Sequence, residues 1–127
     1  MSSSVIDSSA LLALLFKEPG GFAVIEHLSD ALLSAVNLSE VVAKCLDAGM
    51  MLEDARRVVA DLPCRIVPFD PEQALLSASL RAATRPYGLS FGGLACLSLG
   101  LKTGYPVVTA ERAWAECGVG VDVICIR

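Results

Sequence analysis

The stretch GLSFGGLACLSLGLKTGYPVVTAE, residues 88–111, joins a helix to a strand and indicates how the fold is built. Its apolar residues predict a helix over 89–102, which a glycine and a proline end before a short strand at 106–109. Ser90 is a good N-cap for this helix, and a capping box places an acid three residues after the cap. The sequence has Gly93 there, although a glycine inside a helix costs about 0.5–1 kcal/mol relative to alanine. The start of this helix therefore lacks a residue that the local pattern leads us to expect.

Short β-branched runs alternate with amphipathic helical stretches along the whole chain. Strands are expected near residues 4–6, 31–35, 65–69, 106–109 and 121–126. Helices are expected at residues 8–16, 22–29, 36–48, 52–61, 71–83, 89–102 and 111–116. Helices between successive strands are typical of an α/β fold with a central parallel β-sheet flanked by helices on both faces. The length of 127 residues fits a single domain, residues 1–127.

The composition is rich in apolar residues and poor in charged ones. Hydrophobic residues make up 54% of the chain and charged residues 19%, which is more apolar surface than one small core hides. We therefore expect a homodimer or another protein complex. The longest uninterrupted apolar run, residues 10–16, is too short to cross a membrane, and no Lys or Arg precedes it as in a signal peptide. No membrane partner is expected.

Cysteine spacing and net charge restrict the function further. The five cysteines form no C-x-x-C pair and are odd in number, which favours buried thiols in the reducing cytoplasm. The net charge of −4 argues against a broad basic face that coats nucleic acid. A local phosphate site stays possible, because a cleft of carboxylates attracts phosphate once it holds a divalent cation.

Three acidic residues recur at the same place relative to the predicted strands. Asp7 comes directly after the first strand, Glu111 follows the fourth, and Glu40 lies one turn into the helix after the second. The carboxyl ends of parallel strands meet at one edge of the sheet, where ligands bind. Converging carboxylates repel one another unless they hold a cation, and Mg²⁺ prefers carboxylate oxygens and water. The spacing therefore indicates a metal-dependent hydrolase site for phosphodiesters.

Helix capping is the simpler explanation for each acid taken singly. Asp7 can cap the helix that follows it, and Asn37 with Glu40 has a capping-box-like spacing. Glu111 lies two residues after a possible Thr109 cap and complements a helix dipole. Capping does not explain why acids recur after successive strands.

Other candidate residues give weaker signals. His27, the only histidine, is expected on a solvent-facing helix surface, and Trp114 in the core or an interface. Arg81 and Arg85 share a helix face, as either a solvated surface or a phosphate clamp. The chain has no G-x-x-x-x-G-K-[ST], G-x-G-x-x-G or G-x-S-x-G motif, which excludes the common nucleotide-binding and serine-hydrolase classes.

Four segments together resemble the PIN domain, and specifically the toxin half of VapBC-type toxin–antitoxin pairs. They are VIDSSALLALLFKEPG, LLSAVNLSEVVAK, VPFDPEQALLSASLRAATRPYGLSFGGLACL and YPVVTAERAW, in the order and spacing of that family. The resemblance covers nearly the whole chain. It implies a PIN-domain α/β fold, an endoribonuclease that depends on Mg²⁺, with Mn²⁺ as an alternative, RNA as substrate, and a cognate VapB-like antitoxin as partner.

The resemblance also assigns site residues. Asp7, Glu40 and Glu111 match catalytic and metal-binding acids of the family, and Ser9 and Thr109 match hydroxyls that line its site. Two further residues complete the predicted lining, Asn37 and Gly93. Residues predicted to bind RNA or phosphate are Arg81, Arg85 and Arg112.

Gly93 stands where the family carries its third acid, and Leu94 stands where it usually carries arginine. Three carboxylates can still hold one Mg²⁺ through waters, but a second ion is disfavoured. This predicts attenuated activity, and it predicts that Gly93→Asp restores a carboxylate where the helix dipole stabilises it.

Two alternatives remain. The first is a catalytically inactive PIN domain that serves as an antitoxin-binding or regulatory module, which the Gly93–Leu94 pair supports. The second is a receiver-like phosphoacceptor domain, which needs adjacent acids after the first strand and a lysine after a late strand. Asp7 stands alone and Lys102 lies inside a helix, so this alternative fits less well.

Overall fold

The computed structural model describes residues 3–127, so the first two residues of the predicted domain lie outside the described part. The strands are β1 (Ser4–Ile6), β2 (Ala31–Ser34), β3 (Cys64–Val67), β4 (Val107–Thr109) and β5 (Val123–Cys125). The α-helices are α1 (Ser8–Leu15), α2 (Ile25–Leu28), α3 (Ala35–Asp47), α4 (Leu52–Ala60), α5 (Pro71–Ser79), α6 (Arg81–Thr84) and α7 (Phe91–Thr103). Short 3₁₀ helices are η1 (Gly21–Val24), η2 (Arg85–Tyr87) and η3 (Arg112–Glu116).

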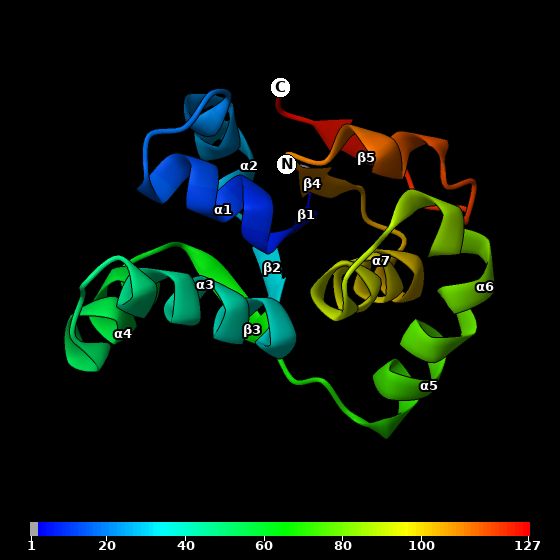
Figure 1. The fold of residues 1–127 in the computed structure, drawn as a ribbon, viewed down its shortest axis with the longest axis horizontal. Helices are drawn as coiled ribbons and strands as arrows, with labels where there is room; N and C mark the ends of the chain where they lie inside the picture. Colours follow the sequence, from blue (N-terminus) through cyan, green and yellow to red (C-terminus); the bar gives the residue numbers. More distant parts are fainter. Residues whose placement is uncertain (1–2) are drawn as a thin grey trace.

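The strands form one parallel sheet in the order β3-β2-β1-β4-β5, which confirms the predicted fold class (Figure 1). Val5 of β1 pairs with Leu32 of β2 on one side and with Val107 of β4 on the other. The chain therefore leaves β1 in one direction along the sheet and returns on its other side. Such a reversal opens a crevice beyond the carboxyl ends of β1 and β4, where open α/β sheets bind ligands.

Alternate side chains of β1 enter two separate cores, so helices cover both faces of the sheet. Ile6 packs with Leu11 of α1 and Val41 of α3, whereas Val5 packs with Leu97 of α7 and with Trp114. Helix α7 runs between the sheet and α5, and its residues 92–100 are all buried. Strands buried on both faces are typical of parallel sheets and explain their continuous β-branched runs.

Several predicted elements differ in detail from the structure. The helix expected at 71–83 is divided at Leu80 into α5 and α6, and the segment expected as a helix at 22–29 begins as the 3₁₀ helix η1. Residues 111–116, expected as a helix, form the 3₁₀ helix η3, and the last strand is shortened to Val123–Cys125. These short connections are held by contacts with neighbouring elements, which local sequence patterns do not record.

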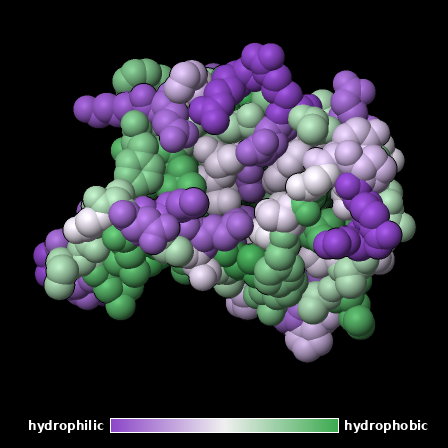
Figure 2. All heavy atoms as spheres, in the orientation of Figure 1, coloured by the Kyte–Doolittle hydropathy of each residue, from purple (hydrophilic) through white to green (hydrophobic). Residues whose placement is uncertain are grey.

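Many large apolar side chains stay exposed in the isolated chain. Phe22 is 80% exposed and Ile25 is 54% exposed, whereas Leu28 of the same segment is buried. Leu46 is 40% exposed on α3. Figure 2 shows apolar side chains gathered over the α3–α4 end and beside the start of α7. Such surface is consistent with the predicted association, and the dimer itself stays a prediction.

Within residues 3–127, no helix combines the length and the apolar character that a bilayer crossing requires.

Candidate functional site

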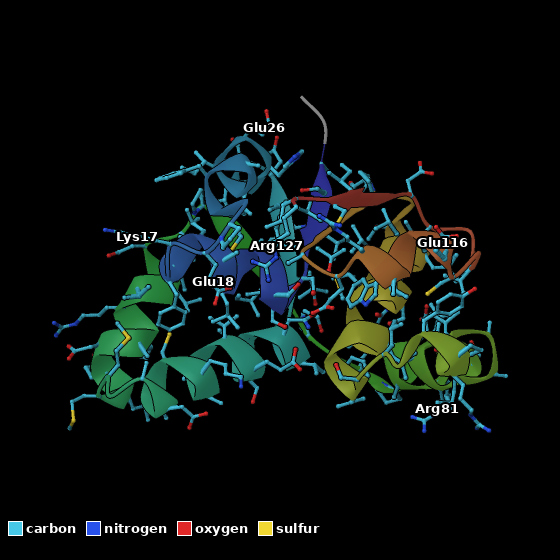
Figure 3. The ribbon with its side chains drawn as sticks, turned by 45° about the horizontal axis from the view of Figure 1, so that its top comes forward. Lys17, Glu18, Glu26, Arg81, Glu116 and Arg127 are labelled. Carbon is cyan, nitrogen blue, oxygen red and sulfur yellow. The ribbon has the colours of Figure 1, made fainter. Side chains whose placement is uncertain are left out.

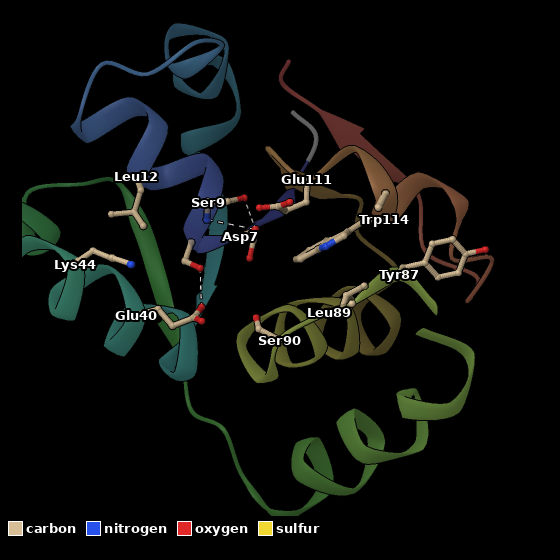
Figure 4. A pocket seen from close by; sticks show the side chains of 13 residues that line it. Asp7, Ser9, Leu12, Glu40, Lys44, Tyr87, Leu89, Ser90, Glu111 and Trp114 are labelled. Atoms are coloured by element: carbon tan, nitrogen blue, oxygen red, sulfur yellow. Dashed lines mark hydrogen bonds between the residues drawn. The ribbon is translucent and has the colours of Figure 1, made fainter. Parts of the chain in front are cut away.

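A pocket of about 310 Å³ lies at the carboxyl edge of the sheet, between α1, α3, the start of α7 and η3 (Figure 4). Asp7, Glu40 and Glu111 all line it. The fold therefore brings the three predicted acids to one pocket. Across residues 3–127, however, no three His, Cys, Asp or Glu side chains lie close enough together to hold a metal ion as they stand.

Asp7 is both the N-cap of α1 and the most buried acid of the pocket. It is 2% exposed, and its Oδ2 accepts hydrogen bonds from the Ser9 backbone N–H at 3.3 Å, from the Ser9 hydroxyl and from Thr109 Oγ1 at 3.0 Å. Ser9 Oγ in turn accepts from the Ala110 N–H at 3.0 Å. Within the described chain Oδ1 has no hydrogen-bond donor, so capping uses one oxygen and leaves the other available to the pocket.

Burial raises the pKa of Asp7 to about 6, against an ordinary value of 3.8. The hydrogen bonds from Ser9 and Thr109 oppose this shift, and the nearby charge of Glu40 adds to it. Burial thus disfavours the ionised carboxylate, and a cation beside Oδ1 would favour it.

Glu40 is held by residues from two helices. Its Oε1 accepts hydrogen bonds from Ser8 Oγ at 2.6 Å and from Asn37 Nδ2 at 3.0 Å. Asn37 is fully buried and donates also to the Gly92 carbonyl at 3.0 Å, which connects α3 to α7. The suggested capping box is wrong in one respect, because Ser34 caps α3 by accepting from Val36 N–H.

Gly92 allows Glu40 to reach the first turn of α7. A Cβ atom at this position would lie 2.0 Å from Glu40 Oε1 and 2.2 Å from Oε2. The carboxylate of Glu40 therefore occupies the space that any other residue at position 92 would fill. Gly92 is absent from the predicted site residues, and its local sequence signal is a glycine that costs stability at a helix start.

Gly93 faces Trp114. Its N–H donates to Ser90 Oγ at 3.2 Å, which confirms Ser90 as the N-cap of α7. A Cβ atom on Gly93 would lie 2.9 Å from Trp114 Cζ2 and 3.4 Å from the Leu89 side chain. Trp114 is 6% exposed and belongs to the core between α7 and the sheet. Of the two expected places for Trp114, the core and an interface, the structure has the core. We expected that aspartate at position 93 would add a carboxylate without disturbing its neighbours. The structure corrects this, because the Trp114 indole has to shift before a side chain at position 93 can be accommodated.

Of the four remaining predicted residues, Glu111 lines the pocket and the three arginines do not. Glu111 is exposed at the pocket, whereas Arg81 and Arg85 are exposed on α6 and η2 and are not among the pocket-lining residues. Figure 3 shows Arg81 pointing away from the molecule. Arg112 donates from Nε to the Arg127 carbonyl at 2.8 Å and does not line the pocket either.

Lys44 lines the pocket and is absent from the predicted site. Its sequence signal is its place four residues after Glu40 on α3, which puts both side chains on the same helix face.

His27 is not among the lining residues, and its Nε2 lies 3.5 Å from Glu26 Oε1. The five cysteines are free thiols; Cys45, Cys96 and Cys117 are buried as expected, whereas Cys64 and Cys125 are partly exposed.

The donor atoms of the pocket fit a hard divalent cation. Asp7 Oδ1 and Glu40 Oε2 accept no hydrogen bond from the described residues, and the Glu111 carboxylate accepts none either. Carboxylate oxygens completed by water are the ligands that Mg²⁺ prefers. The raised pKa of Asp7 is consistent with a position that a cation stabilises.

These features define the class of this protein as an α/β domain whose parallel sheet carries carboxylates at its topological switch point. A model of the PIN domain family matches residues 4–119, and the chain therefore belongs to the PIN domain family. The comparison of the sequence with curated proteins found no match.

Solved structures share the fold over nearly the whole chain. A toxin–antitoxin complex from Klebsiella pneumoniae has a TM-score of 0.76 at 17% identity, covering 98% of both chains. DNA-bound VapBC from Salmonella typhimurium has a TM-score of 0.74 at 16% identity, covering 100% of both. VapC20 from Mycobacterium tuberculosis, a toxin that cleaves the sarcin–ricin loop, has a TM-score of 0.71 at 13% identity, covering 94% of this chain and 99% of its own.

Proposed function

We propose that this protein is a VapC-like endoribonuclease toxin that depends on Mg²⁺ and cleaves RNA. The observation that carries the proposal is the convergence of Asp7, Glu40 and Glu111 on one pocket at the switch point of a PIN-domain sheet. Nucleases of this family generally use divalent metals. The sarcin–ricin-loop-cleaving toxin among the similar structures supports RNA as the substrate class.

The residues of the pocket have distinct roles in this proposal. Asp7, Glu40 and Glu111 hold Mg²⁺, or Mn²⁺, through the oxygens that the protein leaves free. The bound ion supplies activation of a water molecule and neutralises the charge that develops on the phosphate. Ser9 and Thr109 hold Asp7 Oδ2 so that Oδ1 faces the pocket.

Glu40 is oriented in a similar way from two sides. Ser8 and Asn37 both donate to its Oε1, which leaves Oε2 for the cation. Activity is attenuated, because Gly93 adds no carboxylate and Trp114 packs against that position. A second ion is therefore disfavoured at this site.

The proposal includes partners and location. Several similar structures are VapBC complexes, which supports a cognate VapB-like antitoxin that neutralises the protein. Exposed Phe22, Phe91 and Leu75 support further association, for which a homodimer is the simplest form. The proposed location is the cytoplasm, whose reducing conditions suit five free cysteines.

A second candidate function is an inactive PIN domain that binds an antitoxin or regulates another protein. The observation that favours it is specific: within residues 3–127 the acids do not form a ready group of three metal ligands. Glycine at position 93, which supplies no carboxylate, also favours this second function.

Cleavage of a structured RNA under single-turnover conditions separates the two functions. The purified protein, Asp7→Asn and Glu40→Gln are compared in Mg²⁺, in Mn²⁺ and in EDTA. We expect metal-dependent cleavage by the unchanged protein and its loss in both variants, which keep the side-chain size. No cleavage in either metal would favour the binding module, and equal cleavage by all three proteins would contradict the proposed site.

A further inference from the structure

Lys44 stands where two hollows of the surface meet. The acid pocket and a neighbouring hollow of about 530 Å³ share four lining residues, which are Ser9, Leu12, Lys44 and Glu111. The second hollow continues along α1 toward Phe16 and Arg127. A strand of nucleic acid that occupies the acid pocket can thus continue into the second hollow, and it passes Lys44 on the way.

The ammonium group of Lys44 is available for a ligand. Within residues 3–127 Lys44 forms no ion pair, although Glu40 precedes it by one turn of α3 and Asp47 follows it. Of the described residues that line the acid pocket, Lys44 is the only one with a positive charge. Figure 4 shows its side chain extending from α3 toward the pocket.

Arg127, the other cation of the second hollow, is already engaged. Its Nη1 donates to the Pro19 carbonyl at 3.1 Å and lies 3.6 Å from Glu18 Oε1. These contacts hold the end of the chain against the loop after α1. Lys44 is therefore the cation at this junction that forms no ion pair within the described chain, and Glu18 and Asp47 line the second hollow with it.

The charge balance of the pocket gives Lys44 a function. Three carboxylates repel a phosphodiester, and the second metal ion that would offset this charge in a two-metal nuclease is disfavoured here. A lysine ammonium is a compact point charge that binds phosphate oxygens from many directions. Its position beside the acids, rather than on them, suits the phosphate next to the one that is cleaved.

We propose that Lys44 binds a non-bridging oxygen of the RNA backbone as the strand passes from the acid pocket into the neighbouring hollow. This inference rests on the proposed function, because it takes the acid pocket as the place where RNA binds. Lys44 acts in binding and does not take part in bond cleavage. Its removal weakens binding without changing the geometry of Asp7 or Glu40.

The test is equilibrium binding of a fluorescein-labelled single-stranded RNA of mixed sequence, followed by anisotropy in Ca²⁺ and again in EDTA. The unchanged protein is compared with Lys44→Gln and Lys44→Arg at several salt concentrations. Loss of one phosphate contact should lower the slope of log K against log salt by about 0.7 and weaken binding about five-fold at 0.1 M salt. Lys44→Arg should restore both.

Lys102→Gln is the matched control. It removes the same charge from the far end of α7, where Lys102 lies 3.6 Å from Glu72. We expect this variant to keep the affinity and salt slope of the unchanged protein. Lys44 is exposed on α3, so equal thermal midpoints of all four proteins are expected to show that folding is unaffected.

Three outcomes would overturn the inference in distinguishable ways. If the unchanged protein binds RNA and Lys44→Gln binds it equally well with the same slope, Lys44 has no phosphate contact. If Lys102→Gln changes binding as much, only net charge matters. If the unchanged protein binds no RNA, the proposed function fails together with this inference.

Discussion

The two walls of the acid pocket are built on opposite principles. The wall of β1, α1 and α3 carries Asp7 and Glu40, each held by hydrogen bonds from neighbouring hydroxyl or amide groups. The wall of α7 and η3 contributes Ser90, the N-cap of α7, and the Trp114 indole. Helix α7 carries Gly92 and Gly93 in its first turn and supplies no carboxylate. Hydrogen bonds offset the desolvation of the two carboxylates on the first wall, whereas the second wall carries one carboxylate, the solvent-exposed Glu111 before η3.

The difference shows how the start of α7 is stabilised without an acid of its own. A helix N-terminus favours a negative charge, and the carboxylate of Glu40 lies against Gly92 in the first turn. The charge therefore comes from α3 through space instead of from position 93 along the chain. Gly92 is essential to this arrangement, whereas Gly93 is matched to Trp114.

Gly92→Ala should have the largest effect, because it breaks the contact between the two walls. A Cβ atom would lie 2.0 Å from Glu40 Oε1, so the carboxylate must leave the hydrogen bonds from Ser8 and Asn37. We expect loss of metal-dependent cleavage and a loss of about 1–3 kcal/mol in the free energy of unfolding. Urea unfolding and the cleavage assay measure both, and unchanged stability would mean that Glu40 is not held there.

The burial of Asp7 should make the free energy of unfolding depend on pH, and Asp7→Asn tests this. The pKa of Asp7 is about 6 in the folded protein and 3.8 ordinarily, so the folded state binds more protons between these values. The free energy of unfolding should therefore fall as pH rises from about 4 to above 6, by about 1–3 kcal/mol from this group.

Asp7→Asn should lose this pH dependence and be more stable than the unchanged protein at pH 7.5 without metal. Denaturant titrations at pH 4.5, 6 and 7.5 measure it. Added Mg²⁺ should recover stability in the unchanged protein and much less in the variant. Parallel pH profiles of the two proteins would show that Asp7 is ionised at little cost.

The pair of positions 93 and 114 should behave as coupled. Gly93→Asp places a Cβ atom 2.9 Å from the Trp114 ring, so the single variant should be destabilised despite the favourable helix dipole. Trp114→Leu removes the obstacle, and a double-mutant cycle should give a favourable coupling of about 1 kcal/mol. RNA cleavage should rise in the double variant more than in Gly93→Asp. An additive cycle would mean that the indole shifts without cost.

The smallest effect is expected from Arg81→Ala with Arg85→Ala. Both side chains are exposed on α6 and η2, away from the residues that line the acid pocket. Exposed charges are screened by solvent and salt, so RNA binding should change by about two-fold at most. A loss of RNA affinity as large as that of Lys44→Gln would instead support the predicted phosphate clamp formed by these two arginines.

The sequence by itself determined the order of strands and helices and the edge of the sheet at which acids collect. Periodicity, caps such as Ser90 and strand-ending acids such as Asp7 act within a few residues, so local patterns record them. The place of Glu40 one turn into its helix follows from the same local rules.

Only the tertiary structure decided what each acid touches. The bond from Asn37 to Gly92 joins residues 55 apart in the chain, and Ser9 meets Thr109 across 100. Four features depend on how α3, α7 and η3 pack around one crevice. They are the hydrogen bonding of only one Asp7 oxygen, the space for Glu40 over Gly92, the indole beside Gly93, and the position of Lys44 without an ion pair in the described chain. Such contacts leave no periodic trace in the sequence, because each is fixed by a single close approach between distant segments.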